Sequence, residues 1–183
     1  MDPLKEFCVF SGTSHPSLAK QIADCLGVKL GEIDLGTFPD GEIHAQILEN
    51  VRGRSVFVVQ SIAGKPNYFL MELLIVIDAL KRASAQNITA VLPYYGYSRQ
   101  DRKDRPRVAI TAKLVADLLE SAGATRVLTM DLHAGQLQGF FNVPLDNLSA
   151  RPILLEACRQ LSVEQSVVVA PDTGSLKMAR EFA

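Results

Sequence analysis

The sequence is poor in cysteine and has almost no surplus of either charge. Its three cysteines, Cys8, Cys25 and Cys158, are an odd number without the Cys-x-x-Cys spacing of zinc sites. We therefore expect neither a disulfide framework nor a zinc site, but buried free thiols in a reducing, cytoplasmic compartment. The formal net charge of -1 creates no overall basic field, so we expect no nucleic acid and no membrane as partner. A small-molecule partner fits this charge balance better.

Long apolar runs are missing as well. The start, MDPLKEF, lacks the apolar core of a signal peptide, and Glu72 and Asp78 interrupt the longest apolar run, 69–80. No secretion signal and no transmembrane helix are therefore expected. With 48% hydrophobic and 21% charged residues, the 183-residue chain has a globular composition and is long enough for one domain and part of another.

Short β-rich runs alternate with amphipathic segments, which predicts an α/β fold with a parallel sheet flanked by helices. Strands are expected at 7–11, 55–60, 88–92, 126–130 and 166–170. Helices are expected at 15–26, 67–85, 111–122 and 151–160, and another begins near Ser175. The segments 32–37 and 43–48 alternate apolar and polar residues around the turn FPDG, the pattern of a protruding β-hairpin.

The chain is expected to hold one domain at 1–148 and the beginning of a second at 149–183. Ser14 is the predicted N-cap of the first helix and Gly27 its stop, and the first sheet is expected to be complete between Phe7 and Met130. The final helix has an apolar face, but no further strand follows to cover it. We therefore expect the second domain to be truncated after one strand and one helix.

A densely charged segment, SRQDRKDRPR at 98–107, follows the strand at 88–92. Its cationic side chains outnumber Asp101 and Asp104, and they are Arg99, Arg102, Lys103, Arg105 and Arg107. Arginine binds phosphate oxygens in a two-pronged fashion and stays protonated, which suits a polyphosphate; otherwise the segment is a solvated charged loop. The glycine-rich motifs GxxxxGK and GxGxxG are absent, so side chains would have to hold the phosphates.

Asp131 and His133 come directly after the strand at 126–130. In open α/β sheets the carboxyl ends of the strands carry the ligand sites. Magnesium prefers oxygen ligands and keeps several waters, so Asp131 would be an ordinary partial ligand and His133 an unusual one. A structural pair, with the imidazole bonded to the backbone, is the alternative. Together with the charged segment, the pair indicates a site for a metal-bound polyphosphate.

Several short sequence motifs are similar to those of one family. SRQDRKDR, VLTMDLHAGQLQGFF, VPLDN, FPDGE and VVVAPDTG resemble ribose-phosphate pyrophosphokinase, also called phosphoribosyl-pyrophosphate synthetase, and the resemblance runs from Val9 to the last residue. It implies a phosphoribosyltransferase-like fold whose second, similar domain is incomplete here. It also implies transfer of the diphosphoryl group of MgATP to the 1-hydroxyl of ribose 5-phosphate, giving phosphoribosyl pyrophosphate and AMP. A non-catalytic regulatory paralogue is the alternative, against which the intact motifs argue.

The resemblance also assigns roles to the residues at the strand ends. Arg99, Gln100 and His133 would contact ATP, and Asp131, His133 and Asp172 would help to hold Mg²⁺. From the residues alone, Asp172 also fits the N-cap of the helix that follows it. The family's catalytic loop and sugar-phosphate loop would lie beyond Ala183, so no catalytic residue is assigned. The 183-residue chain is therefore expected to be inactive by itself.

The hairpin tip FPDGE has a role of its own by resemblance. Phe38 would stack on adenine while Asp40 and Glu42 accept hydrogen bonds from the nucleotide, which a neighbouring subunit would hold. This arrangement implies an obligate homo-oligomer, a hexamer by resemblance. From the residues alone, the same five residues form an ordinary turn at the tip of a hairpin. Asn142 is a departure, because many relatives have aspartate at that place.

Overall fold

The computed structural model describes residues 7–160 and 167–183. It divides the chain into two compact units, Met1–Leu148 and Ser149–Ala183, which are considered separately. The first unit contains a five-stranded sheet in the order β1-β4-β5-β6-β7, and every neighbouring pair is parallel. These strands are β1 (Phe7–Ser11), β4 (Ser55–Val59), β5 (Asn87–Leu92), β6 (Arg126–Met130) and β7 (Leu145–Leu148). The predicted parallel α/β sheet is confirmed.

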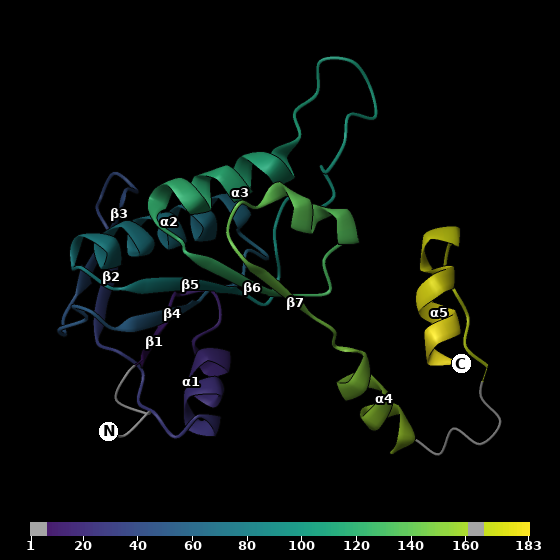
Figure 1. The fold of residues 1–183 in the computed structure, drawn as a ribbon, viewed down its shortest axis with the longest axis horizontal. Coiled ribbons are helices and arrows are strands. Elements are labelled where there is room, and N and C mark those ends of the chain that lie inside the picture. The colour runs from purple at the N-terminus through teal and green to yellow at the C-terminus, as the bar shows by residue number, and fades with distance from the viewer. Residues whose placement is uncertain (1–6, 161–166) are drawn as a thin grey trace. The chain divides into compact units, whose positions relative to one another are not determined.

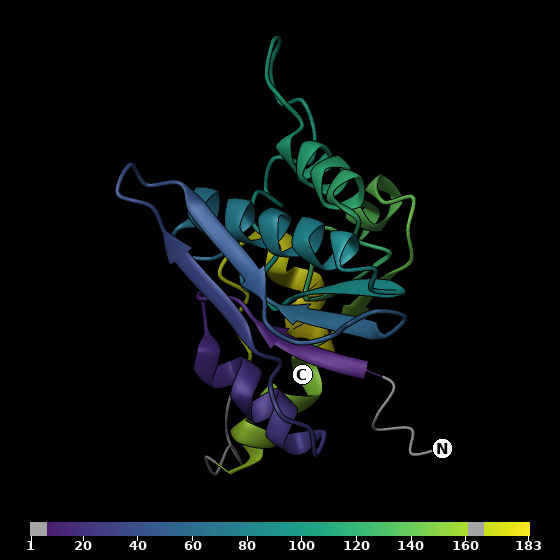
Figure 2. The same ribbon diagram turned by 90° about the vertical axis from the view of Figure 1, so that its left-hand side faces the viewer.

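Three helices cover the two faces of this sheet unequally. Figures 1 and 2 show α2 (Pro66–Arg82) and α3 (Thr111–Ala122) on one face and α1 (Pro16–Cys25) on the other. Alternate residues of a strand point to opposite faces, so Phe10 joins the large core under α2 and α3 while Val9 packs with α1. Burying one large apolar side chain of this core contributes about 2 kcal/mol.

A two-stranded antiparallel hairpin stands beside the sheet. It consists of β2 (Ile33–Thr37) and β3 (Ile43–Ile47), with Ile33 opposite Ile47 and Thr37 opposite Ile43. Its apolar side chains pack against the core under α2, whereas the polar ones face outward. The hairpin prediction is confirmed, and Figure 2 shows how its tip projects beyond the sheet.

The start of α1 differs from the prediction. His15, not Ser14, is the N-cap, and its Nδ1 accepts a hydrogen bond of 3.2 Å from the Leu18 amide. The Ser14 hydroxyl instead accepts a 2.8 Å bond from the Ser61 amide, which ties the loop after β1 to the end of β4. The Ser14 side chain therefore bonds to a residue distant in sequence instead of capping the helix. The predicted stop at Gly27 is confirmed, since its φ of 68° lies in the left-handed region, which glycine adopts without steric cost.

The sheet was expected to be complete at Met130, but it contains one more strand. The fifth strand, β7, pairs with β6 in the register Val127 to Leu145 and Met130 to Leu148. It has four residues, three of them exposed, so its apolar pattern is too weak to predict a strand. A short strand at the edge of a sheet is defined by its hydrogen bonds to the neighbouring strand rather than by its own residues.

The second unit contains α4 (Arg151–Arg159), the short 3-10 helix η3 (Thr173–Ser175) and α5 (Leu176–Phe182). The predicted strand at 166–170 is wrong for 167–170, and residue 166 lies outside the described part of the chain. Val167 and Val169 are 83% and 76% exposed, because no second strand pairs with this segment among the described residues.

The three cysteines differ in burial, and the helices share one property. Cys8 is buried as predicted, but Cys25 and Cys158 are exposed, which corrects the expectation of three buried thiols. All three are free of disulfide bonds. Among the described helices, none combines the length and the apolar character needed to cross a membrane.

Candidate functional site

The charged loop, defined as residues 98–110, and the segment 131–142 leave the sheet at the same edge. They follow β5 and β6, which are neighbouring parallel strands, so both start at carboxyl ends. A hydrogen bond of 3.3 Å from Gln136 Nε2 to Asp101 Oδ2 joins them directly. The fold therefore brings the predicted phosphate-binding arginines and the Asp131–His133 pair into one region.

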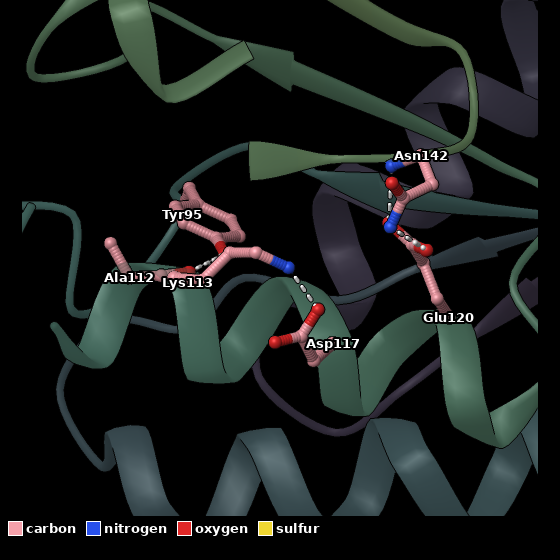
Figure 3. Close-up of polar contacts among 6 residues, drawn as sticks. All are labelled: Tyr95, Ala112, Lys113, Asp117, Glu120 and Asn142. Carbon is pink, nitrogen blue, oxygen red and sulfur yellow. Dashed lines mark hydrogen bonds and ion pairs between the residues drawn. The ribbon is translucent and has the colours of Figure 1, made fainter. Parts of the chain in front are cut away.

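The base of the charged loop is anchored to the start of α3. The Tyr95 hydroxyl is buried and donates a 2.8 Å hydrogen bond to the carbonyl of Ala112, as Figure 3 shows. Burial raises the pKa of this phenol, so it remains a donor. The Gln100 carbonyl accepts a 3.1 Å bond from the Ala112 amide, and Gln100 Oε1 accepts from the Thr111 hydroxyl. Gln100 thus has a defined place, with its Nε2 left for another partner.

The charged loop encloses a hollow of about 500 Å³. The hollow is lined by Arg99, Gln100, Arg102, Asp104, Arg105, Val108 and Ala109. Arg105 is paired with Asp104 at 3.5 Å, but Arg99 and Arg102 have no ion-pair partner within the described part of the chain. Both guanidinium groups are exposed. A hollow with unpaired guanidinium groups at its wall is suited to binding an anion.

Asp131 lies at a sharp turn that β7 holds in place. Its amide donates a 2.9 Å bond to the Leu148 carbonyl, and the next amide, of Leu132, donates a 3.1 Å bond to Asn147 Oδ1. The side chains of Asp131 and His133 are exposed, whereas Leu132 between them packs on the core. The two polar side chains are therefore presented outward from the same turn. The strand that the sequence analysis missed is what fixes this presentation.

Left-handed backbone at residues other than glycine is concentrated around these two segments. Among the described residues, four other than glycine have a positive φ: Ser84, Tyr97, Arg107 and Asp131. The last three belong to the charged loop, its base or the turn after β6. Side chains with a Cβ are disfavoured in this region by about 1 kcal/mol or more, and such residues cluster at ligand sites.

A second brace holds the far end of the segment 131–142 against α3. Glu120 accepts two hydrogen bonds from Asn142, one of 2.7 Å from its amide and one of 3.0 Å from Nδ2, drawn in Figure 3. Next to it, the Phe141 ring packs edge-on against Tyr95 with centroids 5.7 Å apart. Sequence reasoning missed Glu120, because no local pattern relates a half-buried helix residue to an asparagine 22 positions later. An asparagine here can donate to the carboxylate, which an ionised aspartate cannot do.

The hairpin tip is ordered by its own contacts. Phe38 is 50% exposed and packs against the His44 ring at 5.0 Å, while Asp40 Oδ1 accepts a 3.1 Å bond from the Glu42 amide. Gly41 makes the turn possible with a φ of 94°. Within the described residues, no hydrogen bond or ion pair joins Phe38, Asp40 or Glu42 to the charged loop or to Asp131 and His133. The fold places the tip residues in a separate location.

Comparison with known proteins decides the family. The family model described as the N-terminal domain of ribose phosphate pyrophosphokinase matches residues 7–123, which is more than half of the chain. The chain belongs to the ribose-phosphate pyrophosphokinase family. The resemblance seen in its motifs is confirmed, and the matched range includes the hairpin and the charged loop.

Individual relatives of the ribose-phosphate pyrophosphokinase family agree with this assignment. The chain is 57% identical over 182 residues to "Ribose-phosphate pyrophosphokinase" of Clostridium perfringens, covering 98% of this chain and 57% of that protein. The identity to the Wolinella succinogenes protein of the same name is 52% over 180 residues, or 98% of this chain and 58% of that one. The chain therefore spans little more than half the length of these relatives.

A solved structure of the family has the same fold. The crystal structure of phosphoribosylpyrophosphate synthetase from Mycobacterium smegmatis aligns with a TM-score of 0.93 at 44% sequence identity. The alignment covers 97% of this chain and 60% of the Mycobacterium chain. The predicted fold class, including the protruding hairpin, is confirmed by this agreement.

The second unit of this pyrophosphokinase-family chain contains Asp172. Its Oδ1 accepts two bonds of 2.8 Å from Ser175, one from the hydroxyl and one from the amide. The hydroxyl bond and then the amide bond lower the pKa of the Asp172 carboxyl, so it is ionised at neutral pH. The N-cap interpretation is confirmed, because Asp172 caps η3. Its role at a metal stays a prediction.

The family's expected metal would have few ligands from this part of the protein. Among the described residues, no three His, Cys, Asp or Glu side chains cluster in a way that could hold a metal ion. Magnesium usually binds through one or two carboxylates, several waters and the phosphates of its substrate. The carboxylate of Asp131 is exposed on the turn after β6 and fits such a partial site, whereas the imidazole of His133 fits it less well.

Proposed function

We propose that this chain supplies the ATP-binding part of a ribose-phosphate diphosphokinase. The complete protein would transfer the diphosphoryl group of ATP to the 1-hydroxyl of ribose 5-phosphate, giving phosphoribosyl pyrophosphate and AMP. The observation that carries the proposal is the hydrogen bond between Gln136 and Asp101, which unites the unpaired arginines of the charged loop with Asp131 and His133. The proposal is further supported by the names of relatives such as the Clostridium protein.

The proposed reaction breaks the bond between the β-phosphorus and the oxygen bridging to the α-phosphate. The 1-hydroxyl oxygen of ribose 5-phosphate forms the new bond to the β-phosphorus and loses its proton, and AMP leaves. Such reactions depend on positioning and on charge neutralisation more than on covalent work by the protein. No general base is assigned among the described residues.

In this proposal, the side chains of the charged loop orient the triphosphate. Arg99 grips phosphate oxygens with its guanidinium group, and Gln100 donates from Nε2 because its Oε1 is already engaged by Thr111. His133 binds a phosphate oxygen or the metal. Bound Mg²⁺ would neutralise phosphate charge, and Asp131 would contribute a carboxylate oxygen to hold it. By resemblance, Asp172 would contribute to a second magnesium site.

The hairpin contributes to a different copy of the site in this proposal. Phe38 stacks on the adenine of a neighbouring subunit and Asp40 and Glu42 accept hydrogen bonds there, so the protein works as a homo-oligomer, a hexamer by resemblance. Support comes from Phe38, whose ring is half exposed, and from the separation of the tip from the charged loop in the contacts of the described residues.

Free cysteines support a reducing, cytoplasmic location.

One assay tests the activity. The complete protein is mixed with ATP, magnesium and ribose 5-phosphate, and AMP and phosphoribosyl pyrophosphate are measured together. Equal amounts of both products, absent when ribose 5-phosphate is omitted, are expected. ATP binding without either product would favour a regulatory paralogue instead.

The 183 residues themselves are expected to be silent in the same assay. Their first unit has a complete core and should fold, but none of the candidate groups named here would orient the sugar phosphate. Circular dichroism establishes that the sample is folded before activity is measured. Product formation at an ordinary enzymatic rate would show that the acceptor site lies within residues 1–183.

A further inference from the structure

Tyr97 has a backbone conformation that its side chain does not favour. Its φ of 62° lies in the left-handed region, which an L-residue with a Cβ adopts only at a steric cost. Glycine and asparagine adopt this conformation more readily, yet the chain has tyrosine here, two residues before Arg99. A strained residue beside a ligand-binding segment persists only if surrounding contacts hold it, and it is a reason to look for a functional role.

The contacts of Tyr97 connect two parts of the molecule. Its hydroxyl donates a hydrogen bond to Oδ1 of Asn67, in the first turn of α2. Its carbonyl accepts a 2.9 Å bond from the amide of Gln100. The ring therefore ties the turn to a rigid helix, and the carbonyl sets the direction of the backbone at Gln100.

The residues before Tyr97 leave the turn little room to shift. A Cβ on Gly96 would lie 2.4 Å from Ile62 Cγ2, and Ile62 is 1% exposed. The Ile62 amide also donates a 3.0 Å bond to the Tyr94 carbonyl. With Gly96 pressed against Ile62, the direction in which the charged loop leaves the protein depends on the dihedral angles at Tyr97.

We propose that Tyr97, held by Asn67, is a positioning residue that directs Arg99 and Gln100 toward the triphosphate. The proposal rests on the proposed function, because the direction matters only if the charged loop binds ATP. Tyr97 itself need not touch the nucleotide, since its hydroxyl is engaged by Asn67. Without the anchor, the turn relaxes toward ordinary backbone angles and the two side chains lose their common direction.

Kinetics of the complete enzyme test the proposal with three matched variants. Tyr97→Phe and Asn67→Ala each remove one partner of the bond, and Tyr94→Phe removes a hydroxyl from the neighbouring exposed tyrosine as the control. We expect the first two to raise the KM for ATP about three- to tenfold, as for loss of one net hydrogen bond. The KM for ribose 5-phosphate, the kcat and the Tm should stay near their wild-type values. The double variant should be no worse than either single variant.

Hydrogen exchange at the Gln100 amide tests the same idea without activity. This amide is bonded to the Tyr97 carbonyl, so it should exchange faster in Tyr97→Phe and in Asn67→Ala but not in Tyr94→Phe. Unchanged exchange at Gln100 in folded variants would overturn the positioning role, as would a fall in Tm and kcat with no change in the KM for ATP. If the wild-type enzyme makes no phosphoribosyl pyrophosphate, the proposed function fails while this exchange result still decides whether Tyr97 orders the loop. Should Tyr97→Phe not fold, Asn67→Ala, an exposed change, provides both measurements.

Discussion

The side-chain Nε2 of Gln136 donates a hydrogen bond to the carboxylate of Asp101, which lies 35 positions earlier in the sequence. The two residues lie in segments that follow neighbouring parallel strands, and each segment carries one half of the candidate site. Their contact gives a physical reason to treat Arg99 and His133 as parts of one site rather than as two unrelated motifs. The first two predictions concern these side chains.

Arg99→Ala in the complete protein should weaken kcat/KM for ATP by the equivalent of about 2 to 3 kcal/mol, the size of a charge-assisted contact. The guanidinium group is exposed, so the Tm should hardly change. Arg52→Ala is the matched control, because Arg52 is also exposed but precedes β4, at the amino end of a strand rather than at a carboxyl end. ATP kinetics identical to those of wild type would rule out the phosphate contact.

His133→Ala should lower kcat while leaving the protein folded, because the imidazole is exposed on the turn after β6. His15→Ala is expected to lower the stability and leave kcat unchanged. It removes the N-cap acceptor of α1 and should cost about 1 kcal/mol of stability with turnover unaffected. Denaturant unfolding and steady-state rates, measured on both variants, check the contrast. An unfolded His133 variant whose remaining folded fraction is fully active would make the histidine structural.

Glu72→Ala should be the most destabilising of these changes. The buried carboxylate of Glu72 accepts bonds of 2.8 Å from the Thr13 amide and 2.6 Å from Gln60 Nε2. Its removal takes this acceptor from the partly buried Thr13 amide and from the buried Gln60 side chain, which should lower the free energy of unfolding by about 3 kcal/mol. Asp78→Ala, on the same helix, removes an exposed carboxylate paired with Arg82 and should cost far less. Equal unfolding midpoints for the two variants would contradict this account.

The three thiols should differ in their reactivity and in their effect on stability. Burial raises the pKa of the Cys8 thiol, whereas Cys25 and Cys158 are exposed. Iodoacetamide should therefore modify the two exposed cysteines first, as mass spectrometry of peptides would report. Because the folded pKa of Cys8 lies above the unfolded value, its contribution to stability is present below that value and is lost as pH rises.

The pH effect has a direct control. Unfolding midpoints of wild type and of Cys8→Ala are compared below and above the ordinary thiol pKa of 9.0. Wild type should lose more stability than Cys8→Ala across this interval, since Tyr95, whose pKa is also raised by burial, is present in both proteins. Parallel curves for the two proteins would show that Cys8 contributes nothing to the pH dependence.

Much of the first unit could be predicted because its signals are local. The buried strand β5, the amphipathic helix α3 and the hairpin around FPDG each repeat their apolar residues with the period of their own structure. Arg99 and His133 could be selected as site candidates because each follows such a strand, at the edge where parallel sheets place ligands. Periodicity and residue chemistry therefore determined the fold class and the positions of these two segments.

Tertiary structure decided what depends on partners far away in the sequence. The strand β7, the bond from Ser61 to Ser14 and the brace between Glu120 and Asn142 leave no local pattern, since each exists only when two distant segments meet. The strand predicted at 166–170 is wrong over 167–170 for the converse reason: its apolar residues have no neighbouring strand among the described residues. A hydrogen bond between distant residues is a property of the folded chain, because folding brings its donor and acceptor together.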